Sequence, residues 1–170
     1  MTDEQSDFEP WPILAALELH GVEYVVIGGI AAVIRGVPFV TRDLDVSPRR
    51  DRDNLDRLAA ALLELEATPK IVGRPNGLDV PLEGAMIAGF ANLSLDTPHG
   101  QLDLVLLPDG TRGYDDLVRS ATRIEVDASL SVLVAALADV IRSKAAAGRP
   151  KDQAQLPILR ETLEQSRREP

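Results

Sequence analysis

The sequence predicts one α/β (α+β) domain, in which helices flank a central mixed β-sheet and the C-terminal part is helical. Strand-like segments rich in β-branched residues alternate with segments whose apolar residues recur at helical spacing. The 170 residues are 45% hydrophobic and 26% charged, which suits a chain that buries a sizeable core. The sequence shows no internal repeat, so a repeat architecture is not expected.

The N-terminal half predicts two helices and two strands that surround a glycine pair. Apolar spacing predicts a helix over 11–20, and the run VEYVVI at 22–27 is typical of a buried strand. Gly28-Gly29 ends that strand, and a short helix over 30–35 follows. Residues 39–47 alternate as a strand with two different faces, and a helix begins after Pro48.

The C-terminal half predicts a hairpin, a further strand pair and the last helices. Residues 67–83 are rich in proline and glycine, which favours irregular structure with a short strand at 70–72. The other predicted elements are strands at 91–96, 101–107, 122–126 and 129–134, and helices at 113–121, 135–147 and 151–166.

These elements indicate three parts of the chain. Residues 1–10 carry four acidic side chains and little to bury, so we expect a flexible tail. Residues 11–134 form the predicted core, and residues 135–170 form C-terminal helices that we expect to complete a site on that core.

Composition excludes several kinds of site. The chain has no cysteine, which excludes disulfides, thiolate zinc sites and cysteine nucleophiles, and two histidines make a histidine-rich metal site unexpected. A net charge of −9 argues against a protein that coats nucleic acid, and it favours a soluble monomer. The longest uncharged stretch, 84–95, is too short to cross a bilayer, and the acidic N-terminus is unlike a signal peptide. We therefore expect a cytoplasmic protein without membrane contact.

The segment TRDLD at 41–45 is the most informative motif. Alternate side chains of a strand share a face, so Asp43 and Asp45 project together, roughly 7 Å apart along the strand, while Leu44 points into the core. Paired carboxylates select a hard cation such as Mg²⁺. The same pattern also occurs by chance on solvated surfaces, so it needs a second observation.

Asp103 is that second observation, because it lies inside the apolar strand segment 101–107. A carboxylate in such a strand needs a partner, since burial of an unpaired charge is costly. An arginine ion pair and a third metal ligand are both compatible with the sequence. Three carboxylates on one face can hold two Mg²⁺ ions, the arrangement used for phosphoryl transfer.

Gly28-Gly29 lies between a hydrophobic strand and a short helix, twelve residues before Thr41. Glycine lets the backbone approach a ligand closely, and a tight turn is the alternative explanation. Neither a Walker loop nor a dinucleotide-binding fingerprint is present. The order of elements places the glycine pair and the carboxylates at the same edge of the sheet.

Together, Gly28-Gly29, Thr41, Asp43, Asp45 and Asp103 resemble the nucleotidyltransferase superfamily, which includes DNA polymerase β. The segment at 143–156, SKAAAGRPKDQAQL, is similar to one in the AbiEii/MenT-type toxin nucleotidyltransferases, with Lys144, Arg149, Lys151 and Asp152 at the matching positions. The resemblance covers most of 22–160. One departure is Gln155, where that family often carries an acidic residue.

The resemblance implies a nucleotidyltransferase fold and transfer of a nucleoside monophosphate from an NTP to an acceptor hydroxyl. It implies that Asp43 and Asp45 bind two Mg²⁺ ions, or Mn²⁺, and that Asp103 binds the ion beside the attacking oxygen. Gly28, Gly29, Thr41, Lys144 and Arg149 would bind the nucleotide, and Lys144 and Asp152 would complete the catalytic set.

Ordinary helix chemistry also explains the C-terminal cluster. Lys144 near a helix C-terminus favours the helix dipole, and Asp152 could cap the next helix. Arg42 is compatible with either an ion pair or a substrate contact.

The resemblance suggests RNA as the acceptor, first of all the tRNA 3′ end, in a toxin with a cognate antitoxin. Two arginine- and lysine-rich groups could form local basic patches: Arg35, Arg49, Arg50, Arg52 and Arg57, and Arg142, Lys144, Arg149 and Lys151. The alternatives are AMP transfer to a partner protein, modification of a small antibiotic, and a non-catalytic binding module of the same fold.

Overall fold

The computed structural model describes residues 7–70 and 82–169. The helices are α1 (Pro10–Leu19), α2 (Gly28–Ile34), α3 (Arg52–Glu64), α4 (Gly84–Ile87), α5 (Tyr114–Leu117), α6 (Leu137–Ala147) and α7 (Pro150–Arg168). The strands are β1 (Tyr24–Ile27), β2 (Asp43–Pro48), β3 (Thr68–Pro69), β4 (Asn92–Thr97), β5 (Gly100–Val105), β6 (Thr122–Asp127) and β7 (Leu130–Val134).

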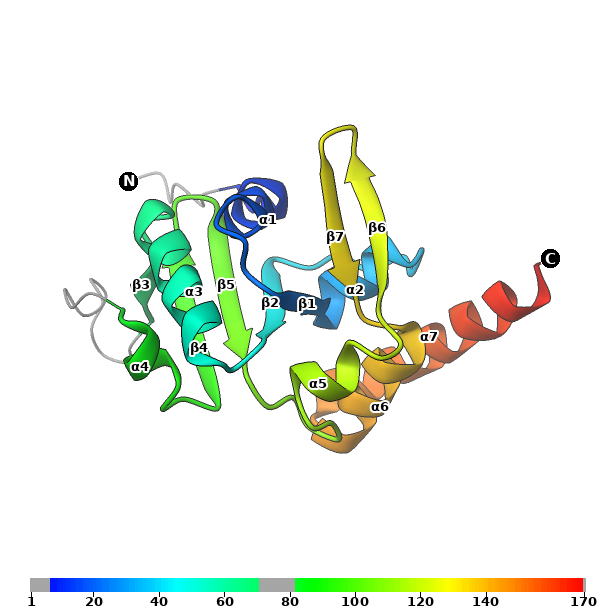
Figure 1. Ribbon diagram of the computed structural model, residues 1–170. Coiled ribbons are helices and arrows are strands. Elements are labelled where there is room, and N and C mark those ends of the chain that lie inside the picture. The colour runs from blue at the N-terminus through cyan, green and yellow to red at the C-terminus, as the bar shows by residue number, and fades with distance from the viewer. Residues whose placement is uncertain (1–6, 71–81, 170) are drawn as a thin grey trace, which may run out of the picture.

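Within the described part of the chain, the strands form one mixed sheet in the order β3-β4-β5-β2-β1-β7-β6. β2 is parallel to β5 and β1 is parallel to β7, whereas the other neighbouring strands are antiparallel. Figure 1 shows α1 and α3 beside each other against the sheet, while α5, α6 and α7 gather at the far end of the β5 and β7 strands. The mixed α/β fold with flanking helices and a helical C-terminal part is therefore confirmed.

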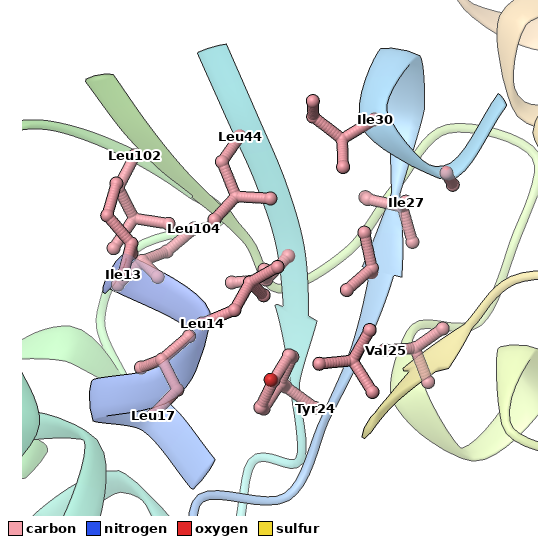
Figure 2. Close-up of a cluster of buried hydrophobic side chains, with 14 of the residues drawn as sticks. Ile13, Leu14, Leu17, Tyr24, Val25, Ile27, Ile30, Leu44, Leu102 and Leu104 are labelled. Atoms are coloured by element: carbon pink, nitrogen blue, oxygen red, sulfur yellow. The ribbon is translucent and has the colours of Figure 1, made fainter. Parts of the chain in front are cut away.

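The core explains which way the central strands face. Leu44 of β2 and Leu102 and Leu104 of β5 are fully buried. They point toward α1, where Leu14 and Leu17 are also fully buried (Figure 2). Because side chains alternate along a strand, the residues between these leucines face the opposite side of the sheet. The hydrophobic effect thus fixes the orientation of β2 and β5, and with it the face that carries their carboxylates.

Two predicted boundaries are corrected by the contacts that the chain makes. The expected tail over 1–10 is wrong at its C-terminal end, because Pro10 begins α1, the Glu9 backbone N–H donates to His99 O at 2.9 Å, and Phe8 packs against the core. The expected strand over 39–47 begins only at Asp43 and continues to Pro48. Strand alternation therefore does not govern the residues before Asp43.

Other expectations fall partly beyond the described residues. The expected strand at 70–72 has only its first residue among them, and the observed strand, β3, covers Thr68–Pro69. The C-terminal helices agree closely with the prediction, and Gly148, with a left-handed φ of +65°, separates α6 from α7. Over 7–70 and 82–169, every helix is too short or too polar to span a bilayer.

Candidate active site

Three aspartates from two strands meet on the face of the sheet opposite the α1 core. Parallel pairing of β2 with β5 places Asp45 directly beside Asp103, and Asp43 lies two residues earlier on the same face. Each of the three is half-buried, and one carboxylate oxygen from each lies within 4.8 Å of the others. The predicted convergence of Asp43, Asp45 and Asp103 is therefore observed.

The glycine pair makes room for the acidic strand. A Cβ placed on Gly28 would overlap Asp45 Oδ2 and lie 3.0 Å from Asp45 Cγ, and a Cβ on Gly29 would lie 3.0 Å from Thr41 Oγ1. Gly28 also has a left-handed φ of +64°, and it is the first residue of α2 rather than part of a separate turn. The space that the glycines leave open is thus taken by side chains of this chain, while phosphate contact by their backbone remains a prediction.

Two hydrogen bonds orient the outer carboxylates. Thr41 Oγ1 donates to Asp43 Oδ1 at 2.9 Å. Gln101 Nε2 donates to both oxygens of Asp103, at 3.1 and 3.0 Å. Thr41 is half-buried beside Gly29, so the structure gives it a role in holding Asp43, in addition to the predicted nucleotide contact.

Electrostatics at the centre of the cluster favour a bound cation. Burial, the charges of Asp43 and Asp103 and a hydrogen bond with Asp103 together raise the pKa of Asp45 to about 7, and only the charge of Lys144 acts in the opposite direction. Three carboxylates at this separation repel one another in the absence of a cation. The donor set consists of oxygen atoms alone, which fits Mg²⁺ or Mn²⁺.

The C-terminal cluster is built around a buried carboxylate. The Asp152 side chain is 1% exposed and forms ion pairs with Lys144 Nζ at 3.5 Å and with Arg149 Nε at 2.6 Å. Burial raises the pKa of Asp152, but the hydrogen bond and charge of Arg149, with help from Lys144, lower it below its ordinary value. The N-cap position of α7 is held by Arg149 and not by Asp152, so the ion-pair interpretation describes Asp152 better than the helix-cap interpretation.

Two cavities meet at the three aspartates Asp43, Asp45 and Asp103, which are called here the triad. The first, of about 300 Å³, extends toward β4 and is called here the β4 cavity; it reaches Asn92, Ser94, Asp109 and Val140. The second, of about 440 Å³, is called the Thr41 cavity; it reaches Phe39, Arg42, Asp43, Lys151 and Gln155. Both cavities are lined by Asp45, Asp103, Lys144, Arg149 and Asp152. The triad therefore lies at the boundary between two binding spaces.

The cavities differ in charge. Arg42 and Lys151 line only the Thr41 cavity, and neither forms an ion pair within the described part of the chain. Every cation that lines the β4 cavity, Lys144 and Arg149, is already paired with Asp152. Asp109, which is exposed and has no ion-pair partner among the described residues, adds a negative charge there. The Thr41 cavity is thus the more favourable one for phosphates.

Most of the arginines proposed for basic patches have other partners. Arg35 donates to the carbonyls of Val134 and Ala135, and Arg49 and Arg57 pair with Glu23. Arg52 pairs with Asp56, and Arg142 pairs with Asp116 and Asp139. The physical basis for a broad RNA-binding surface is correspondingly weak.

Several residues of the site carried no signal in the sequence. Ser94 and Asp109 become site residues only because β4 pairs with β5 and the chain after β5 passes the triad, whereas Gln101 lies two residues before Asp103 on the same face of β5 and could have been found by strand alternation. Gln155, the departure from the toxin pattern, lines the Thr41 cavity, and its buried Oε1 lacks a hydrogen-bond partner within the described residues. A lone serine on a neighbouring strand has no spacing pattern that a sequence would reveal.

Comparison with known proteins gives a match at the level of structure. No family model and no curated protein sequence matches the chain. The crystal structure of the lincosamide antibiotic adenylyltransferase LnuA, with lincomycin bound, is similar to it with a TM-score of 0.59 and 13% sequence identity, and the match covers 94% of this chain and 97% of that one. The chain has a nucleotidyltransferase fold. Closeness to the AbiEii/MenT-type toxins remains a prediction.

Proposed function

We propose that the protein is a nucleotidyltransferase that moves a nucleoside monophosphate from an NTP to an acceptor hydroxyl and releases pyrophosphate. The observation that carries this proposal is the convergence of Asp43, Asp45 and Asp103 at the boundary of two cavities. A transfer reaction needs two substrates to meet at one metal-binding point, and this arrangement offers a space for each.

The three carboxylates would hold two divalent cations. Mg²⁺ or Mn²⁺ supplies charge neutralisation for the phosphates and lowers the pKa of the attacking hydroxyl. Asp43 and Asp45 would bind both ions, because they lie on the same face of β2 and both line the Thr41 cavity. Asp103, which lines both cavities, would bind the ion beside the attacking oxygen and would receive the proton of the acceptor hydroxyl.

The nucleotide would occupy the Thr41 cavity. A triphosphate carries more charge than two cations neutralise, and Arg42 and Lys151 line this space without an ion-pair partner among the described residues. Lys144 and Arg149, the predicted nucleotide-binding residues of the C-terminal part, lie between the two cavities. The backbone of Gly28 and Gly29 is proposed to contact the phosphates.

The acceptor would be a small, hydroxyl-bearing molecule without negative charge. The β4 cavity has no unpaired cation among its lining residues and contains the exposed Asp109, so a phosphate-rich acceptor would be repelled there. The similar fold of an enzyme that adenylylates an antibiotic is consistent with this choice. The tRNA 3′ end, and with it a toxin role and a cognate antitoxin, is the second candidate, and transfer to a partner protein is the third.

Labelled nucleotides test the function and the acceptor together. Each α-³²P-labelled NTP is incubated with Mg²⁺ and one of three acceptor sets: hydroxylated small molecules including lincomycin, total tRNA, or cell protein. Metal-dependent label on a small molecule is the expected result, and the Asp45→Asn variant is the control. Label on RNA or on protein would replace the preferred acceptor but keep the reaction class.

A non-catalytic module of the same fold gives a different result. An enzyme of this class binds NTP with its cations, so Mg²⁺ plus a suitable NTP raises the melting temperature by mass action. Absence of any Mg²⁺-dependent shift with all four NTPs would contradict the proposed function. The proposed substrates are those of the cytoplasm, where we expect the protein to act.

A further inference from the structure

We infer that Gln101 is a positioning residue for Asp103 and that Lys70 fixes Gln101 in that position. The inference rests on the proposed function of Asp103. Gln101 Nε2 lies 3.1 and 3.0 Å from the two oxygens of Asp103, and Gln101 Oε1 lies 2.9 Å from Lys70 Nζ. The carboxamide therefore joins a surface cation to a carboxylate of the site.

The chemistry of the neighbours fixes the orientation of this amide. An ionised carboxylate only accepts hydrogen bonds, and an ammonium group only donates them. Gln101 must therefore direct its NH₂ toward Asp103 and its oxygen toward Lys70. A flipped amide would place its oxygen against the Asp103 carboxylate and its NH₂ against the Lys70 ammonium. The contact with Lys70 and the contact with Asp103 therefore favour the same amide orientation.

Lys70 is itself held in place. Its backbone N–H donates to Ser94 O at 2.9 Å, and its Nζ lies 3.6 Å from Asp96 Oδ1. Asp96 stands opposite Gln101 in the antiparallel pair of β4 and β5. The sheet thus places Asp96, Lys70, Gln101 and Asp103 in one continuous line that runs from the exposed surface to the triad.

Asp103 needs such a restraint because the two neighbouring carboxylates repel it. Asp45 lies directly beside it across the β2–β5 pair, and Asp43 completes the cluster. A carboxylate repelled from one side turns toward solvent unless a donor holds it. Gln101 supplies that donor on its own strand, two residues away and on the same face.

A neutral donor suits this position better than a cation. Lysine or arginine in place of Gln101 would neutralise Asp103 and compete with a divalent cation for its oxygens. The amide leaves the charge of Asp103 intact, and a carboxylate has two oxygens, so one can bind a cation while the other keeps its amide hydrogen bond. Gln101 therefore orients Asp103 without reducing its affinity for metal.

The alternative is that this chain of contacts only braces the β3–β4–β5 part of the sheet. Thr97→Ala separates the two explanations, because it removes the 2.7 Å hydrogen bond from Thr97 Oγ1 to Gly100 O in the same hairpin without contacting the triad. If the contacts only brace the sheet, their loss lowers the melting temperature and leaves cation binding and turnover unchanged. Loss of a positioning residue changes cation binding and turnover.

The test compares Gln101→Ala, Gln101→Glu, Lys70→Met and Thr97→Ala with the wild type. The first readout is the Mn²⁺ concentration at the midpoint of the metal-induced thermal shift, without nucleotide, and the second is kcat and KM for the NTP. For Gln101→Ala we expect a midpoint raised about 10-fold and kcat lowered about 10-fold, with KM for the NTP within about 2-fold of wild type, as for loss of a group that orients a metal ligand.

The other variants have distinct expected results. Gln101→Glu keeps the length of the side chain but repels Asp103, so it should not restore kcat. Lys70→Met should give a smaller effect in the same direction as Gln101→Ala. A further variant, Lys70→Arg, keeps a cation beside the Gln101 oxygen and should keep wild-type values. Thr97→Ala should lower the melting temperature and leave the Mn²⁺ midpoint unchanged.

Failure of the positioning role and failure of the proposed function give different results. A Gln101→Ala protein with wild-type Mn²⁺ midpoint and wild-type kcat would overturn the positioning role and leave the proposed function intact. A wild-type protein that binds Mn²⁺ but transfers no nucleotide to any acceptor would overturn the proposed function, while the Mn²⁺ midpoints of the variants would still report on Gln101.

Discussion

Gly28 and Asp45 share one small space at the junction of β1, α2 and β2. Ile27, the residue before Gly28, stands opposite Asp45 in the antiparallel pair, which brings the start of α2 against the Asp45 side chain. A Cβ on Gly28 would overlap Asp45 Oδ2 and lie 3.2 Å from Asp45 Cβ. The glycine is thus required by the carboxylate, independently of any ligand.

Gly28→Ala is therefore expected to displace Asp45 and to reduce nucleotide transfer at least 10-fold. The left-handed φ of +64° adds backbone strain of about 1–2 kcal/mol for a residue with a Cβ. Gly36→Ala is the matched control, because Gly36 has φ +90° but no atom within 4 Å of its added Cβ. Melting temperature and transfer rate are measured for both variants; comparable activity in the two would show that Asp45 tolerates the displacement.

Asp45→Asn is expected to abolish transfer and to leave the fold intact. Without metal, the substitution removes one of three mutually repelling carboxylates, so the melting temperature should stay equal or rise. The Mg²⁺-dependent rise in melting temperature should be lost, because the central ligand of the site is gone. Asp53→Asn, in the exposed first turn of α3, is the control. Wild-type turnover in Asp45→Asn would refute the site.

The alternation of polar and apolar residues made the triad predictable. Leu44, Leu102 and Leu104 fix the buried face of their strands, and this determines where Asp43, Asp45 and Asp103 must point. The same hydrophobic signal located most of the helices and strands to within a few residues, but it did not predict α4, Gly84–Ile87. Burial of apolar side chains is a local property of the sequence that the fold must satisfy.

The contacts between side chains of distant segments depend on which strands pair, and no local pattern of the sequence encodes that pairing. The prediction had no means to recognise Gln101 as a neighbour of Lys70, because their contact requires β3 to pair with β4 and β4 with β5. The partners of Arg35 and Arg49 were hidden for the same reason, and so a basic patch was expected where ion pairs and carbonyl contacts exist.

Asp152→Ala is expected to destabilise the protein by about 3 kcal/mol, because it leaves the Lys144 ammonium without its buried partner. The Lys144 side chain is 13% exposed, whereas Arg149 is 74% exposed and can turn to solvent. Lys144→Met in the Asp152→Ala background should recover part of the loss. Urea unfolding of the two single variants and the double variant measures the coupling; strict additivity would mean that the two side chains do not interact.

Asp152 also gives a pH dependence of stability with a defined sign. Its pKa in the folded protein is lowered from 3.8, since Arg149 and Lys144 outweigh the effect of burial. A lowered carboxyl pKa stabilises the fold above 3.8, and this contribution is lost as the pH falls through the folded-state value. The stability difference between wild type and Asp152→Asn should therefore be constant from about pH 5 to 8 and shrink below about pH 4. A difference that grows toward acid would contradict this assignment.

The two cavities predict that removal of a charge from one of them changes KM for one substrate only. Arg42→Ala removes an unpaired cation from the Thr41 cavity, so KM for the NTP should rise about 5- to 20-fold, a loss of about 1–2 kcal/mol for one charge-assisted contact. Asp109→Asn changes the β4 cavity and should alter KM for the acceptor while KM for the NTP stays constant. Both side chains are exposed, so neither substitution should change the melting temperature noticeably. If the two substitutions affected the same substrate, the assignment of nucleotide and acceptor to separate cavities would be wrong. If each affected a different substrate, the nucleotide would lie in the Thr41 cavity and the acceptor in the β4 cavity, with the triad between them.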